Sequence, residues 1–264
     1  MSGLIISVLT NKGGTGKTTT TVSLGQALAR EGKKVLIIDN DSQCNATAVL
    51  LQGEPRYSLY EVYAADNGIS IEDCIHWTEF QQNLYCLPNT PETASIEPIL
   101  IKRGVNGGFI ALRKTLRGYA LKNFDFVLID NPPNHGIFVI NSLYTSDFAI
   151  VPTEAGSKAS VRGLMKAVQF IEDVRQEGNP DLRFLRLLVT KVDRRTSVSR
   201  VITSQLRSNF GEEKMFKTVI PINTDMQKAE LQDETIFKFN SKSGGAKAYR
   251  ELTKELLTIL NNHI

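Results

Sequence analysis

The sequence predicts an α/β fold of the doubly wound type, in which helices flank a mainly parallel sheet. Three observations favour this fold. Short apolar runs typical of buried strands alternate with segments of helical periodicity. A glycine-rich loop directly follows the first apolar run, and carboxylates or prolines close later runs, as is typical where ligands bind at the carboxyl ends of parallel strands. We expect residues 1–264 to form a single domain, because α/β folds of this length are common.

The expected elements follow one another along the chain. A strand over residues 4–9 precedes a helix over Lys17–Arg30, which ends before Gly32. Continuous runs of β-branched and aliphatic residues predict strands at 34–39, 84–87, 125–130, 148–151 and 184–189, and a short one at 218–220. Helices are expected at 58–65, 92–101, 158–177 and 197–209, and from about 245. Residues 46–107 have the least regular pattern.

The composition excludes several classes of protein. The chain has 264 residues, a net charge of +3 and 41% hydrophobic residues, which is ordinary for a globular protein and not for a disordered one. Its three cysteines, Cys44, Cys74 and Cys86, show no Cys-x-x-Cys spacing, which argues against a disulfide scaffold, zinc or an iron–sulfur cluster. Because no signal peptide or apolar span of about 20 residues is present, we expect a cytoplasmic protein.

The segment after the first strand has the spacing of a phosphate-binding P-loop. Its glycines let backbone N–H groups turn toward an anion, and the helix that begins near Gly16 adds the positive end of its dipole. Lys17 is placed to reach the β- and γ-phosphates, and the Thr18 hydroxyl is placed to bind Mg²⁺. A second lysine, Lys12, is unusual and implies additional negative charge to neutralise. The predicted cofactor-binding loop comprises Gly13, Gly14, Thr15, Gly16, Lys17, Thr18 and Thr19.

The run Lys-Gly-Gly-Thr-Gly-Lys-Thr-Thr, which starts at Lys12, resembles the deviant Walker A box of the ParA/MinD superfamily. The resemblance implies a P-loop ATPase that uses ATP and Mg²⁺, with slow hydrolysis in the absence of a partner. It also implies a homodimer that forms on ATP binding, in which Lys12 reaches the partner's phosphates. Lys12 and Lys17 are therefore candidate catalytic residues.

The second predicted strand ends in Asp39, which opens a segment that resembles the switch I sequence of this superfamily. The catalytic acid of the superfamily maps to Asp41, which would orient the attacking water. Asp39 is expected to help hold Mg²⁺ through water. Ser42 and Cys44 replace a proline and a glycine of the superfamily pattern. On the residues alone, the two aspartates could instead be N-caps of the next helix.

Asp130 ends another apolar strand and precedes two prolines, which fits a Walker B carboxylate that binds Mg²⁺-bound water. The predicted metal site comprises Thr18, Asp39 and Asp130. His135 follows in the switch II region, where we expect a surface or interface residue and not an acid or base.

Two later segments resemble the adenine-lining segments of the superfamily. They place Thr190, Pro221 and Asn223 nearest to the base. The resemblance favours ATP. Taken alone, the run Thr190–Asp193 also fits a guanine-recognition box loosely, so GTP remains an alternative.

A local excess of basic residues lies between Arg183 and Lys217, and such an excess on a near-neutral protein suggests a surface that faces a polyanion. It resembles the region by which ParA-type ATPases hold DNA without reading its sequence. The candidate DNA-binding residues are Arg194, Arg195, Arg200 and Arg207. Asp225 occupies the place of a second arginine that relatives often carry. Solvated helix faces are the structural alternative.

The resemblance as a whole implies a partition ATPase. Its ATP-bound dimer would bind nonspecific DNA on the nucleoid and be released when a cargo-bound adaptor of the ParB type stimulates hydrolysis. A membrane-associated, MinD-like positioning ATPase is the alternative. It needs a basic amphipathic helix at the terminus. The apolar stripe of the last helix, with Leu252, Leu256, Leu257 and Leu260, fits a docked core helix better, so no stable membrane association is expected.

Overall fold

The computed structural model describes residues 3–65, 68–154, 158–193 and 195–261. The strands of these residues join one seven-stranded sheet in the order β3-β4-β2-β5-β1-β6-β7. Every neighbouring pair is parallel except β3 and β4, so the doubly wound, mainly parallel fold is confirmed. The strands are β1 (Leu4–Val8), β2 (Val35–Asp39), β3 (His76–Trp77), β4 (Leu84–Leu87), β5 (Phe126–Asp130), β6 (Phe148–Glu154) and β7 (Arg183–Thr190).

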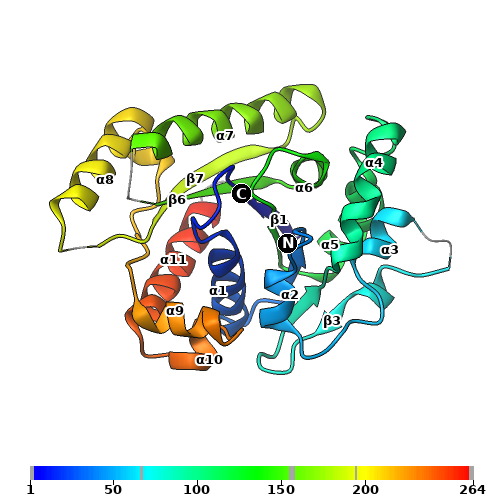
Figure 1. Ribbon diagram of the computed structural model, residues 1–264, viewed down its shortest axis with the longest axis horizontal. Helices are drawn as coiled ribbons and strands as arrows, with labels where there is room; N and C mark the ends of the chain where they lie inside the picture. Colours follow the sequence, from blue (N-terminus) through cyan, green and yellow to red (C-terminus); the bar gives the residue numbers. More distant parts are fainter. Residues whose placement is uncertain (1–2, 66–67, 155–157, 194, 262–264) are drawn as a thin grey trace.

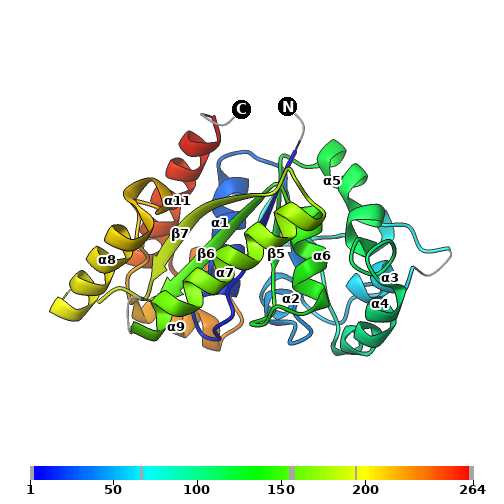
Figure 2. The same cartoon turned by 90° about the horizontal axis from the view of Figure 1, so that it is seen from above.

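Helices cover both faces of the sheet (Figures 1 and 2). Alternate residues of β1 point to opposite faces: Ile6 packs in the cluster that contains α1 and α11, and Ile5 packs in the cluster that contains α3, α5 and α6. The α-helices are α1 (Lys17–Arg30), α2 (Asn45–Leu50), α3 (Leu59–Ala64), α4 (Glu97–Arg103), α5 (Gly118–Asn123), α6 (Ile137–Thr145), α7 (Lys158–Glu177), α8 (Ser197–Phe210), α9 (Thr224–Leu231), α10 (Ile236–Asn240) and α11 (Gly244–Asn261).

The register of the central strands aligns their carboxyl ends. Val8 at the end of β1 is opposite Asp130 at the end of β5, which is in turn opposite Asp39 at the end of β2. The two carboxylates that the sequence singles out therefore lie side by side, next to the loop that follows β1. The fold thus brings the predicted phosphate-binding and carboxylate residues together at the carboxyl ends of the central strands.

Most of the expected elements are confirmed, and the strand at 84–87 and the helix at 158–177 have their predicted bounds. The helix expected at 92–101 is a 3₁₀ segment, η2 (Pro91–Ile96), followed by α4. The pattern analysis did not identify α6, α9 or α10, nor the π-helix η3 (Arg113–Arg117) that runs into α5.

The strand predicted at 218–220 is wrong. These residues form no strand, and the neighbouring Pro221 makes only an isolated bridge to Val192. The N–H groups of Lys217 and Thr218 both donate to the carboxylate of Glu255 on α11, at 2.6 and 2.8 Å. The N–H of Ile220 still donates to the carbonyl of Val189 on β7 at 2.9 Å. Because the two N–H groups before it are committed to a side chain, and the proline after it has no N–H group to donate, this pairing does not extend into a regular ladder.

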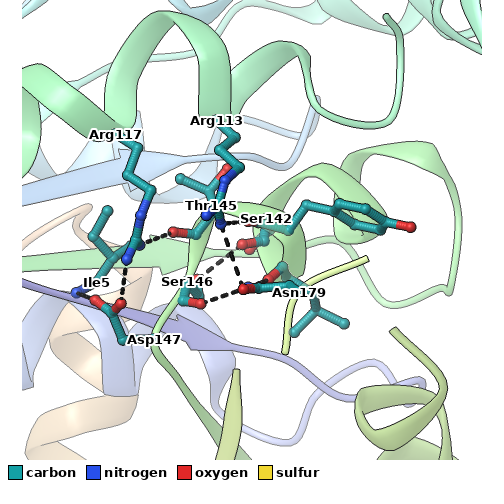
Figure 3. Close-up of polar contacts among 10 residues, drawn as sticks. Ile5, Arg113, Arg117, Ser142, Thr145, Ser146, Asp147 and Asn179 are labelled. Carbon is teal, nitrogen blue, oxygen red and sulfur yellow. Dashed lines mark hydrogen bonds and ion pairs between the residues drawn. The ribbon is translucent and has the colours of Figure 1, made fainter. Parts of the chain in front are cut away.

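A polar network holds the last turn of α6, at the opposite end from its start near the predicted site (Figure 3). Arg113 and Arg117, one turn apart in η3, each donate to a terminal carbonyl of α6, those of Tyr144 and Thr145, both at 2.5 Å. Asn179 donates to two more, the carbonyls of Leu143 and Ser146. The network therefore satisfies the carbonyl groups that a helix C-terminus leaves unpaired.

Asp147 connects this network to the sheet, and we expect Asp147→Ala to lower the free energy of unfolding by about 3 kcal/mol. Its carboxylate accepts from Arg117 at 2.5 Å and from the N–H of Ile5 at 2.8 Å, and both ion-pair side chains are less than one-fifth exposed. The substitution would leave both donors without this acceptor. Urea unfolding measures the change, with the exposed Asp173→Ala as control; equal losses in the two variants would contradict this role for Asp147.

Candidate nucleotide-binding site

The loop between β1 and α1 has the backbone of an anion-binding site. Gly14 and Gly16 adopt the left-handed conformation, with φ of 72° and 82°, which glycine tolerates best. Helix α1 begins at Lys17 with Gly16 as its N-cap, and no side chain caps it and no acidic residue lies in its first turn. Its terminal N–H groups are therefore available to an anion, which fits a nucleotide phosphate.

The two lysines of the loop lie in different surroundings. Lys17 is only 7% exposed, and its ammonium donates to the carbonyl of Lys12 at 3.4 Å. Burial lowers the pKa of Lys17, while the nearby Asp130 and Asp41 oppose that shift. Lys12 is half-exposed, and its ammonium pairs with Glu154 at the end of β6, at 3.1 Å. Lys17 thus lies buried beneath the loop, whereas Lys12 lies on the surface.

Asp130 lies beneath the loop and is almost fully buried. It accepts from the hydroxyl of Thr18 at 2.7 Å and from that of Thr21 at 3.3 Å. Burial, reinforced by Asp39 beside it, raises the pKa of Asp130 to about 8. A carboxylate paired with a hydroxyl is a donor set that suits Mg²⁺.

In the described ranges, no three His, Cys, Asp or Glu side chains are grouped to hold a metal ion. Mg²⁺ usually keeps several waters and binds through one or two carboxylates together with substrate phosphates. The residues present fit a nucleotide-dependent Mg²⁺ site of this kind, with Thr18 and Asp130 as its protein side.

Asp39 fixes the loop that leads into α2. Its carboxylate accepts from both the backbone N–H and the hydroxyl of Thr47, each at 2.7 Å, and from the N–H of Asp41 at 3.2 Å. Burial raises the pKa of Asp39 to about 6. Asp39 therefore accepts a first-turn N–H of α2 from a distance of eight residues along the chain, but it is not the N-cap of α2, which is Cys44. Its water-mediated role toward Mg²⁺ remains a prediction.

Asp41 is only partly buried and lies close enough to Lys17 to act on its pKa. Its carboxylate accepts from the N–H of Gln43 at 3.0 Å, within its own loop. Asp41 is not an N-cap, because the N-cap position of α2 belongs to Cys44. Cys44 has a φ of 57°, which explains why a glycine suits this position in the superfamily pattern. Burial raises the pKa of the Cys44 thiol to about 12, so the thiol stays protonated at neutral pH.

The structure brings together the three residues predicted to contact the base. Thr190, Pro221 and Asn223 line a pocket of about 320 Å³ next to Gly16. The hydroxyl of Thr190 donates to the carbonyl of Thr15 at 2.8 Å, which ties the pocket to the phosphate-binding loop. The side-chain carbonyl of Asn223 accepts from the N–H of Met226 and so caps α9.

Sequence reasoning missed a buried amide network between the two switch segments. Asn40 donates to the side-chain carbonyl of Asn131 at 2.9 Å and to the carbonyl of Phe138 on α6 at 2.8 Å. The hydroxyl of Tyr63 on α3 donates to Asn40 at 2.8 Å. Each asparagine directly follows a strand-ending aspartate, which is the signal that could have identified them. The network mechanically connects the ends of β2 and β5.

Comparisons with known proteins identify the family of this chain. A family described as an AAA domain matches residues 3–184. The chain is 37% identical to the chromosome-partitioning ATPase Soj of Thermus thermophilus over 254 residues, which cover 96% of this chain and 94% of that protein. The chain belongs to the ParA/MinD family of P-loop ATPases.

Two solved structures extend the comparison. Cobyrinic acid a,c-diamide synthase from Mycobacterium smegmatis, with bound ATP analogue and magnesium, is similar with a TM-score of 0.83 and 29% identity, over 99% of this chain and 97% of that one. The cell division ATPase MinD from Pyrococcus furiosus has a TM-score of 0.80 and 26% identity, over 97% and 99%. This ParA/MinD protein is therefore a partition or positioning ATPase.

Two of the four candidate DNA-binding arginines of this ParA/MinD ATPase are described, and each lies beside a carboxylate. Arg195 is 88% exposed and pairs through two nitrogens with Asp193, at 3.0 and 3.1 Å. Arg207 on α8 lies 3.5 Å from Glu212. Arg194 and the side chain of Arg200 lie outside the described residues. The two described arginines thus belong to the same region beyond β7, each beside a carboxylate.

The family arginine position has a different use in this ParA/MinD protein. Asp225 accepts from the side-chain amide of Asn240 at 2.9 Å and so connects α9 to α10. An arginine here could not accept that hydrogen bond. The replacement therefore has a structural reason in this chain.

His135, in the switch II segment, packs against α7, where its ring stacks on Phe170 with a centroid distance of 4.3 Å and an angle of 4°. Burial, with Lys166 as a smaller cause, lowers the pKa of His135 below its ordinary 6.5. The folded protein then binds fewer protons at this site than the unfolded chain, so this histidine costs stability as the pH falls below about 6.5.

We therefore expect His135→Phe, which keeps an aromatic stack, to remove part of the acid destabilisation. The melting temperature of the variant relative to that of the parent should rise as the pH is lowered from 7.5 to 5.5. Thermal unfolding across this range measures the difference. A difference that is constant with pH would show that His135 does not titrate differently in the folded protein.

Proposed function

We propose that this ATPase binds ATP with Mg²⁺, closes into a homodimer around the two nucleotides, and binds DNA without sequence preference in that state. Hydrolysis, which is slow in the single protein and stimulated by a cargo-bound adaptor of the ParB type, releases it. The cycle would segregate a large cargo along the nucleoid. The observation that carries the proposal is the different exposure of the two loop lysines: Lys17 is buried at the site, whereas Lys12 lies on the surface.

Geometry supports each step that the chain's own residues perform. Bound ATP and Mg²⁺ supply the transferable phosphoryl group and the charge neutralisation that phosphoryl transfer requires. Lys17 and the first turn of α1 bind the phosphates, and Thr18 with Asp130 holds the cation side of the site. Asp41 is the carboxylate of the switch loop that is only partly buried, whereas Asp39 is fully buried, so Asp41 is the residue accessible to a water molecule that it would orient.

Lys12 supports the dimer. Its side chain is about half exposed and its ammonium is held by an exposed ion pair with Glu154, and such a pair typically contributes less than about 1 kcal/mol. Exchanging Glu154 for a partner's phosphate therefore costs little. The phosphate offers Lys12 a more highly charged counter-ion, which favours closure only when a nucleotide is present.

The membrane-associated alternative needs an amphipathic helix whose apolar face is free to bind lipid. No helix in the described part of the chain is both long and apolar enough to span a membrane. The apolar stripe of α11, which includes Leu252, Leu256 and Leu260, is buried in the cluster that also contains α1. This stripe is therefore committed to the core and is not available to a lipid surface.

We expect DNA binding to require ATP, to ignore sequence and to weaken steeply with salt, by a slope of about 0.9 in log affinity per phosphate neutralised. Arg195→Glu should lower the affinity about tenfold or more and keep ATP-dependent dimerisation, because Arg195 lies at the surface outside the nucleotide site. Fluorescence anisotropy with two unrelated duplexes, in ATP and in ADP, measures the effect.

The matched control is Lys122→Glu, an exposed lysine on α5 that lies outside the basic segment between Arg183 and Lys217. It makes the same change in net charge. If both variants lose affinity equally, the surface around Arg195 is not the binding site; if the parent binds equally in ATP and ADP, nucleotide does not control DNA binding.

A further inference from the structure

A groove of about 750 Å³ shares no lining residue with the pocket that contains Thr190, Pro221 and Asn223, and the proposed cycle does not use it. One wall is formed by the end of α2, the segment that follows it, and β3. The other wall is formed by the turn between α9 and α10, which Figure 1 shows across from α2 and β3. We call it the Trp77 groove, with Val49, Leu51, Glu54, Trp77, Glu79 and Asp233 among its lining residues.

Apolar side chains lie at the groove with little cover. Trp77, the single tryptophan of the chain, lines it and is 53% exposed. Val49, Leu51 and Phe80 also line it and are only partly buried. Exposed apolar residues at a concave surface are typical of a docking site, and tryptophan is a frequent anchor.

The charge of the groove selects the partner. Its lining includes four carboxylates, those of Glu54, Glu79, Asp233 and Glu234, against the two cations Arg56 and Lys238. The pair between Glu234 and Lys238, at 2.9 Å, is internal. Without this pair, three carboxylates (Glu54, Glu79 and Asp233) face one cation, Arg56, so the groove is acidic. An acidic groove with an aromatic wall favours lysine or arginine beside an apolar side chain and disfavours nucleic acid.

Helix α2 joins the groove to the switch loop. Its last residues line the groove, while Thr47, in its first turn, holds the carboxylate of Asp39. Asp39 in turn accepts from the N–H of Asp41. Since α2 has only six residues, we expect a shift at its end to reach the loop that carries the proposed catalytic acid.

We propose that the Trp77 groove docks a short segment of a partner protein in which basic residues flank an apolar anchor. Docking goes beyond the proposed nucleotide cycle and does not depend on it. The further expectation that an occupied groove changes ATP turnover rests on the proposed role of Asp41.

The test selects a displayed random library of twelve-residue peptides on the full-length protein without nucleotide. Enriched peptides that lack tryptophan are synthesised with a fluorescent label, and their affinity is measured by anisotropy. The same unlabelled peptides are titrated while the emission of Trp77 is recorded. We expect enriched peptides to combine lysine or arginine with a large apolar residue and to shift that emission.

Charge-reversal variants locate the binding. Glu54→Lys with Glu79→Lys should weaken binding about tenfold or more. The matched control is Glu177→Lys with Glu251→Lys, two exposed glutamates on α7 and α11. Failure to enrich peptides, enrichment of acidic ones, an unchanged Trp77 emission, or equal loss in both double variants would overturn the proposal.

ATP turnover at saturating peptide then tests the coupling through α2. We expect the rate of ATP turnover to change by more than about twofold. An unchanged rate would contradict the coupling but not the docking site. Because affinity and emission are measured without nucleotide, failure of the proposed ATP cycle would leave these two results unaffected.

Discussion

Lys17→Ala is expected to weaken ATP binding by about a hundredfold, equivalent to about 2.7 kcal/mol, whereas Lys12→Ala should leave it within about threefold of the parent. The buried ammonium of Lys17 has only the carbonyl of Lys12 as a hydrogen-bond partner in its loop, so a phosphate gains a charge-assisted bond there. Lys12 points to Glu154 instead. Titration with a fluorescent ATP analogue measures both affinities.

The control for lost positive charge is Lys122→Ala, an exposed lysine on α5. Equal loss of ATP affinity in the Lys12 and Lys17 variants would show that both lysines act within one subunit. An unchanged affinity in Lys17→Ala would place the phosphates elsewhere.

Asp41→Ala should keep ATP binding and slow hydrolysis by at least about a hundredfold, the usual range for loss of a residue that positions or deprotonates the nucleophile. Asp41 is only partly buried and its loop is held by Asp39, so its removal does not disturb the phosphate-binding loop. With hydrolysis lost, the ATP-bound dimer should persist after dilution.

Phosphate release measures the rate, with the exposed Asp181→Ala as a control for loss of one carboxylate. A variant that hydrolyses ATP at the parental rate would remove Asp41 from the mechanism. Loss of ATP binding together with hydrolysis would instead indicate that Asp41 organises the whole site.

Local patterns predicted most of the sheet and the phosphate-binding loop because their determinants are contiguous in sequence. The strand β5 and helix α1 have continuous apolar or periodic patterns, and the P-loop has glycines where left-handed backbone occurs. The alignment of Asp39 with Asp130 follows from the rule that ligand sites lie at the carboxyl ends of parallel strands.

Features that depend on distant partners were not predictable in the same way. The 218–220 segment has β-branched residues, but a carboxylate of α11 accepts the N–H groups of Thr218 and of Lys217 before it. The network of Asn40, Asn131 and Tyr63 joins three segments whose proximity only the folded chain shows. Likewise, the sequence shows that Arg195 is basic but not that it pairs with Asp193.

Sedimentation velocity in the presence of Mg²⁺ with either ATP or ADP tests the nucleotide-driven dimer most directly. The parent should sediment as a monomer with ADP and as a dimer with ATP, and Asp41→Ala should remain a dimer when the parent has returned to monomer. Lys12→Ala should stay monomeric with ATP while still binding it. A parent that is monomeric in ATP, or a Lys12→Ala variant that dimerises fully, would contradict the proposed role of Lys12 across the dimer.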